Sequence, residues 1–119
     1  MLTIRKAQME SLKEAQLDAA RRQLIDVLRR DYADDVAPLS EDERRRLVEV
    51  ALAAALRWHL DDELSRERLL GHFVRQGESF GTDSETTWAG DVLADRALTA
   101  TERMNEIDRL WLGRSATGR

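Results

Sequence analysis

The sequence predicts an all-α protein, a single-domain bundle of about five helices with a long N-terminal helix. Composition is the first reason: the 119 residues include 17 Leu and 15 Ala but only 9 Ile and Val together, and β-branched residues lose more freedom in helices. The chain also holds only one proline, a residue that breaks helices. Finally, apolar residues recur at spacings of three and four along most of the chain.

The first predicted helix runs from Arg5 to about Asp34, a stretch without Gly or Pro. Its apolar face comprises Met9, Leu12, Leu17, Ala20, Leu24, Ile25, Val27 and Leu28. At 1.5 Å per residue this helix is about 45 Å long, whereas a compact domain of this size is about 27 Å across. We therefore expect part of it to project, to kink or to pack on another chain. Leu24 and Leu28 are then either core residues or part of a homodimer seam.

A capping box predicts the start of the next helix. Ser40 can cap the N-terminus of a helix, and Glu43 can reach back to the Ser40 amide. This pattern predicts a helix over residues 41–60 that is narrow, alanine-rich and central. The run Arg44-Arg45-Arg46 lies on this helix, and its last two arginines each follow an acidic residue by four positions. We interpret it as a solvated face in which Glu41 pairs with Arg45 and Asp42 pairs with Arg46.

Capping residues and turn residues predict three further helices. Asp61 or Asp62 can cap a third helix that ends near Gly77, and a short fourth helix covers about residues 85–95. Thr99 and Glu102 form a second capping box at the start of the last helix. We expect residues 1–112 to form the helical domain and residues 113–119 to form a flexible C-terminal tail.

Charge and cysteine content exclude several classes of protein. The net charge is −4, and residues 1–60 are neutral while residues 61–119 carry 8 basic and 12 acidic groups. No segment has the basic excess that nucleic acid or an anionic membrane surface requires. The chain has no cysteine, no apolar run long enough to span a membrane and no recognisable signal peptide. We expect a protein of the bacterial cytoplasm.

The motifs of catalysis and metal binding are missing from the sequence. His59 and His72 are the only histidines, and neither belongs to a helical metal-binding pair. No glycine-rich phosphate loop or nucleophile motif occurs. Asp91, between Gly90 and Val92, is the carboxylate that we expect to be partly buried. We therefore predict that the protein is not an enzyme and that it uses no cofactor and no metal.

Arginines and aromatic residues are the candidates for contact with a protein partner. Arg21, Arg22, Arg29 and Arg30 recur near a heptad spacing on the first helix, and we select Arg22 and Arg29 as partner-binding residues. Trp88 and Trp111 fall on apolar stripes, so either core packing or a binding hot spot accounts for them. Phe80 lies in a glycine-bracketed loop, where an aromatic side chain must either anchor the loop or face a partner.

Several short elements, read together, resemble a known family. They are Met1-Leu2-Thr3-Ile4-Arg5, Gln8-Met9, Leu12, Trp58-His59-Leu60, Gly77 with Phe80, Trp88-Ala89, Leu93-Ala94-Asp95 and Arg103-Met104. Their order resembles small helical proteins that are encoded beside bacterial type VI secretion and polymorphic-toxin effector genes. His59 is a departure, because the family pattern tends to have glycine there.

The resemblance implies a non-enzymatic adaptor or chaperone-like accessory protein whose partner is a secreted effector or a secretion component. The alternative is an immunity protein that neutralises a toxin by direct binding, with the acidic residues 61–119 facing a basic nuclease. A DNA-binding regulator would need a basic recognition helix, and residues 99–111 do not provide one. The overlong first helix makes a homodimer a further expectation.

Overall fold

The computed structural model describes the backbone of residues 2–117 and the side chains of residues 13–113. The helices are α1 (Leu2–Asp31), α2 (Ala33–Val36), α3 (Glu41–Arg57), α4 (Glu63–Gln76), α5 (Thr87–Leu93) and α6 (Ala100–Thr117). The all-α prediction is confirmed. The helix that sequence reasoning missed is α2, which has four residues and lies where the first helix was expected to end. None of the helices in the described range is long and apolar enough to cross a membrane.

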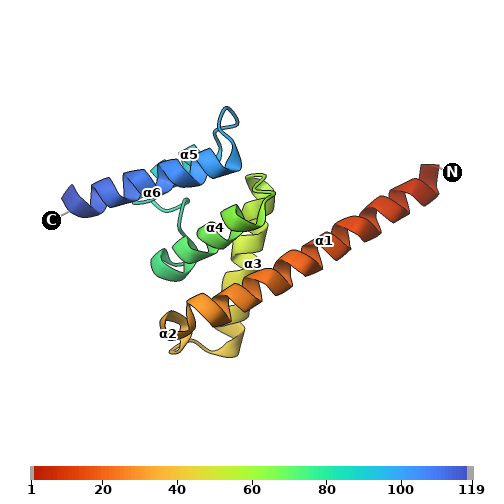
Figure 1. Cartoon of the computed structure of the whole chain (residues 1–119), viewed down its shortest axis with the longest axis horizontal. Helices are drawn as coiled ribbons and strands as arrows, with labels where there is room; N and C mark the ends of the chain where they lie inside the picture. Colours follow the sequence, from red (N-terminus) through yellow and green to blue (C-terminus); the bar gives the residue numbers. More distant parts are fainter. Residues whose placement is uncertain (1, 118–119) are drawn as a thin grey trace.

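The long first helix projects from the body of the protein. Its N-terminal half extends away from every other helix (Figure 1), and the longest dimension of the molecule is 61 Å. Its C-terminal half packs on α3 and α4 through Ala20, Leu24, Val27 and Leu28, which are all buried. Leu24 and Leu28 are therefore core residues, not a homodimer seam. Met9 and Leu12 lie outside the described side chains.

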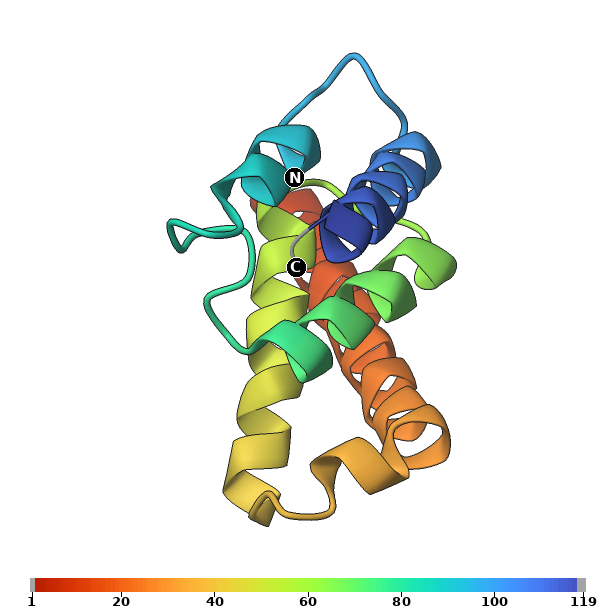
Figure 2. The same cartoon turned by 90° about the vertical axis from the view of Figure 1, so that its left-hand side faces the viewer.

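Helix α4, and not the expected α3, occupies the centre of the bundle. It contacts α1, α2, α3 and α6, and Figure 2 shows it lying across the crossed helices α1 and α3, with α6 on its other side. Five consecutive residues are buried on it, from Leu69 to Phe73. Gly71 permits this crowding, because a Cβ there would lie 2.4 Å from the hydroxyl oxygen of Tyr32.

The predicted caps are confirmed in detail. Ser40 and Glu43 form both hydrogen bonds of a capping box, and Thr99 and Glu102 do the same at the start of α6. Asp62, one of the two expected residues, caps α4 by accepting from the Ser65 amide at 2.9 Å. These bonds satisfy amides that the first turn of a helix leaves free.

Two expectations about helix surfaces need correction. Glu41 pairs with Arg45 at 3.0 Å as predicted, but Arg46 reaches Glu78 at 2.5 Å instead of Asp42. Asp91 is exposed on α5 and is not the partly buried carboxylate that we expected. Helix α6 continues to Thr117, past the predicted boundary at Gly113, and the flexible tail over residues 113–119 stays a prediction.

The turn between α3 and α4 contains a non-glycine residue in the left-handed region. His59 has a φ of 55°, in the left-handed region that favours glycine. The Leu60 amide donates to the Ala55 carbonyl at 2.9 Å and the His59 amide donates to the Leu56 carbonyl at 3.3 Å. These two bonds define a Schellman motif, which ends a helix with one left-handed residue.

Candidate partner-binding surfaces

The predicted partner-binding residues do not gather on one surface. Arg22 and Arg29 lie on α1, whereas Trp88 and Trp111 lie on α5 and α6 at the other end of the bundle. Phe80 lies in the loop between α4 and α5. Each group therefore has to be judged by its own surroundings.

Phe80 is a core residue, and its selection as a partner-binding residue was wrong. Its side chain is 1% exposed. It stacks on His72 with ring centroids 4.8 Å apart and meets the edge of Phe73 at 6.0 Å. Of the two roles that the sequence allowed, anchoring of the loop is the one observed.

Trp88 and Trp111 pack on each other. Their ring centroids are 6.4 Å apart, and the indole nitrogen of Trp88 donates to the Glu85 carbonyl at 3.1 Å. Both side chains are half-buried. The pair joins α5 to α6, and its exposed parts leave a role in partner contact untested.

Arg22 and Arg29 differ from the other two arginines of their stripe. Arg21 binds Glu49 at 2.6 Å and Asp18 at 2.7 Å, and Arg30 binds Asp31 at 3.1 Å. Arg22 and Arg29 are exposed and form no ion pair with any residue whose side chain is described, although Arg22 donates to the Asp18 carbonyl at 3.4 Å. These two cations thus remain available for an acidic partner.

A groove with an apolar floor lies where the projecting half of α1 meets the body. We call it the leucine groove; it measures about 730 Å³ and runs between α1, the end of α3 and the start of α4. Its floor contains Leu17, Ala20, Leu52, Ala55, Leu56 and Leu60, and its rim carries Lys13, Asp61, Glu63 and Arg66. Leu56 is 55% exposed. Such open apolar surface is typical of interaction sites.

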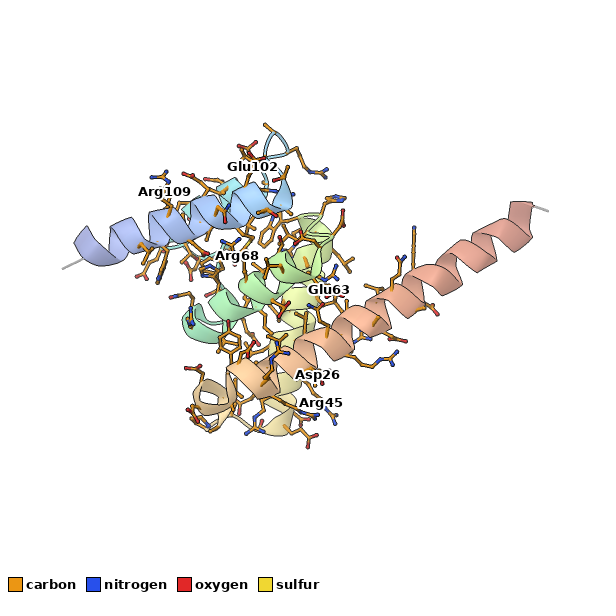
Figure 3. All side chains as sticks on the ribbon, in the orientation of Figure 1. Asp26, Arg45, Glu63, Arg68, Glu102 and Arg109 are labelled. Carbon is orange, nitrogen blue, oxygen red and sulfur yellow. The ribbon has the colours of Figure 1, made fainter. Side chains whose placement is uncertain are left out.

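A second groove lies at the other end of α1, where it faces α2 and the start of α3. We call it the arginine groove; it measures about 510 Å³. Its apolar lining comprises Ile25, Leu28, Ala33, Val36, Ala37 and Val48, and its charged lining comprises Arg29, Glu41, Arg44 and Arg45. Figure 3 labels Arg45, which lies at this end of the bundle. Of the predicted residues, Arg29 alone lines it.

A partly buried polar cluster joins α4 to α6, and sequence reasoning missed it. Asp108 accepts from Arg68 at 2.6 Å and lies 2.8 Å from Nε2 of His72. Burial lowers the pKa of His72, and the hydrogen bond to Asp108 offsets only part of that effect. Burial would raise the pKa of Asp108, but its bonds to Arg68 and His72 outweigh burial and lower it.

This arrangement fits a structural role. Neutral His72 donates from Nε2 to the carboxylate, while its ring face is covered by Phe80. The pairing could not be read from the sequence, because His72 and Asp108 are 36 positions apart.

No group of three potential metal ligands comes together among the described side chains. His59 is exposed at its turn, and His72 is occupied by Asp108. Known proteins give no guide to the function: no family model, no curated protein and no solved structure matches this chain.

Proposed function

We propose that the protein is a non-enzymatic, protein-binding adaptor or chaperone-like accessory protein, and that its partner is a secreted effector or a component of a secretion machine. The observation that carries the proposal is the leucine groove beside the projecting half of α1. The resemblance described above adds the class of partner. We infer that the groove receives an apolar helix face of that partner.

The exposed fractions of the leucine side chains support partner binding at the leucine groove. Leu56 is largely exposed, although Leu52 and Leu60 beside it are buried. A single exposed leucine is ordinary, but here it continues a concave apolar floor. The projecting turns of α1 lie next to this floor with Lys13, Glu14, Ala15 and Gln16 exposed. A helical segment without tertiary packing is marginal in water, so a partner laid along it would stabilise it.

The test is a pull-down of the tagged protein from its native host, read by mass spectrometry. The wild type should retain an effector or secretion component in near-stoichiometric amount, and Leu56→Asp should lose it. Leu112→Asp is the matched control, because Leu112 is 70% exposed on α6 and lies far from the groove. Circular dichroism of both variants should match the wild type. Recovery of the protein alone, or retention of the partner by Leu56→Asp, contradicts the proposal.

The immunity-protein alternative is favoured by one observation. Asp61, Asp62 and Glu63 are exposed, and Asp61 and Glu63 lie on the rim of the leucine groove, where they would meet a basic surface such as that of a nuclease. Co-expression with a toxin encoded nearby separates the two roles. An immunity protein restores growth, whereas an adaptor leaves the toxin active and promotes its delivery.

A further inference from the structure

The arginine groove combines an apolar floor with an excess of positive charge. Its lining holds three arginines and one carboxylate, Glu41. That carboxylate is already held by Arg45 at 3.0 Å. The acidic residues of α2, Asp34 and Asp35, do not line the groove. The groove therefore presents more cationic than anionic groups above buried Leu28, Val36 and Val48.

The three arginines are held in different ways. Arg44 donates from Nε to the Val36 carbonyl at 3.0 Å and from Nη2 to the Ala37 carbonyl at 3.3 Å. These bonds satisfy carbonyls at the end of α2 and fix the Arg44 side chain in place. Arg45 pairs with Glu41 at the surface, and Arg29 has no ion-pair partner among the described side chains. Arg44 is thus held in place by the backbone, whereas the exposed Arg45 and Arg29 can turn toward a ligand.

We propose that the arginine groove binds a short acidic and apolar peptide segment of a partner protein, with leucine-like side chains on the floor and carboxylates paired to Arg29 and its neighbours. Charge complementarity selects an acidic ligand, since arginine presents several donors to a carboxylate. The groove is open and flanked by α1 and α3, as in proteins that seat an amphipathic segment between helices. Its volume lies within the usual range of ligand sites.

This inference does not rest on the proposed function, because the two grooves lie at opposite ends of the packed part of α1. If both hold, the protein would have two separate docking sites. An adaptor needs such an arrangement, since it must hold two partners at once.

The experiment measures fluorescence anisotropy with a fluorescein-labelled peptide of alternating Glu-Glu and Leu-Leu pairs. We expect saturable binding below about 1 mM that weakens as salt is added. A peptide with Lys in place of every Glu should not bind. Arg29→Glu should weaken binding of the acidic peptide at least ~10-fold. The matched control is Arg22→Glu, which removes the other arginine without an ion pair among the described side chains of α1, lies outside the groove and should change binding less than ~2-fold.

Several outcomes would overturn the proposal. Absence of saturable binding up to about 1 mM would do so, and so would equal binding of the acidic and lysine peptides. If Arg29→Glu and Arg22→Glu weaken peptide binding equally, the peptide binds elsewhere or is attracted only by the general positive charge of the surface. Binding of decanoate in the absence of peptide binding would assign the groove to a fatty acid instead. Leu56→Asp should leave peptide binding unchanged, so failure of the leucine groove and failure of the arginine groove are distinguishable.

Discussion

Two joints hold this protein together, and they are built from different chemistry. In the first, α1 and α3 pack on each other and on α4, and every buried side chain that α1 and α3 contribute within the described range is apolar. In the second, α6 packs on α4 and α5, and buried polar groups lie among the apolar ones. Arg103 and His72 are the largest of these. The comparison teaches that the interior of the first joint depends on apolar packing, with ion pairs such as Arg21–Glu49 only at its exposed edge, whereas the second joint also depends on buried hydrogen bonds and on pH.

The first joint is broken most directly at Leu24. Its side chain is fully buried between helices, so Leu24→Asp places a carboxylate in apolar surroundings. We expect a loss of more than about 4 kcal/mol, enough to unfold most of a small domain. Urea denaturation followed by circular dichroism measures it. Ala19→Asp, an exposed neighbour on the same helix, should change stability by less than about 0.5 kcal/mol. A folded Leu24→Asp protein would refute the packing of this joint.

The second joint is broken most directly at Arg103. This side chain is 5% exposed, and its guanidinium donates to the carbonyls of Trp58, Leu93 and Thr99 at 2.5, 2.8 and 3.3 Å. It therefore connects the end of α3, the end of α5 and the start of α6. Arg103→Met fills much of the same space but leaves the Trp58 and Leu93 carbonyls without this donor, while Thr99 still accepts from the residue 103 amide, so we expect a loss of about 2–4 kcal/mol.

The matched control for Arg103→Met is Arg109→Met on the same helix. Arg109 is exposed and pairs with Glu106, so its loss should cost less than about 1 kcal/mol. Thermal unfolding of both variants gives the difference. Equal effects of the two substitutions would show that the buried hydrogen bonds of Arg103 do not hold α6 in place.

The two joints also differ in how far the sequence predicts them. The apolar stripe of α1 and both capping boxes are local patterns, so helix starts and the buried face of α1 could be predicted. The bond of Arg103 to the Trp58 carbonyl and the pairing of His72 with Asp108 join residues 45 and 36 positions apart, and no local pattern encodes them. For the same reason the sequence left open whether Phe80 anchors its loop or faces a partner, and its ring completes the second joint by stacking on His72.

The candidate sites were predicted less well than the fold, because exposure depends on what the other helices leave uncovered. Leu56 has the same local sequence character as buried Leu52 and Leu60, yet it is 55% exposed. Arg22 and Arg29 were predicted as binding residues, but only the structure shows that Arg21 and Arg30 are already paired. The floor of the arginine groove depends on α2, a helix that the sequence did not predict.

Acidification should weaken the second joint before the first. The pKa of His72 is lowered in the folded state from 6.5, so unfolding takes up a proton once the pH falls below about 6.5. The stability that neutral His72 contributes is therefore present above this pH and is lost as the pH falls through the folded-state pKa. The pKa of Asp108 is also lowered from its ordinary 3.8, and its contribution is lost at lower pH still.

The effect of His72 is measured by urea denaturation at pH 7.5 and pH 5.5. The wild type should be less stable at pH 5.5, and His72→Gln should show a smaller difference between the two pH values. His59→Asn is the control, because His59 is the only other histidine and is exposed, and asparagine tolerates its left-handed backbone. A pH dependence that disappears in His59→Asn, but not in His72→Gln, would contradict the assignment.

The smallest expected effect lies at His59, in the turn that links the two joints. The Trp58 carbonyl accepts from Arg103 of the second joint, while buried Leu60 belongs to the first. Between them, His59 adopts a φ of 55° that costs a non-glycine residue roughly 1–2 kcal/mol. Glycine loses about 0.5–1 kcal/mol more backbone entropy on folding, so His59→Gly should be more stable by about 0.5–1 kcal/mol.

His59→Val tests the same geometry from the other side. A β-branched residue fits the left-handed region worse than histidine does, so this variant should be less stable than the wild type. Thermal unfolding should therefore rank glycine above histidine and histidine above valine. The reverse order would mean that His59 is held by contacts of its ring and not by its backbone. With the predicted order, this turn keeps Trp58 and Leu60 in their separate joints through backbone conformation alone.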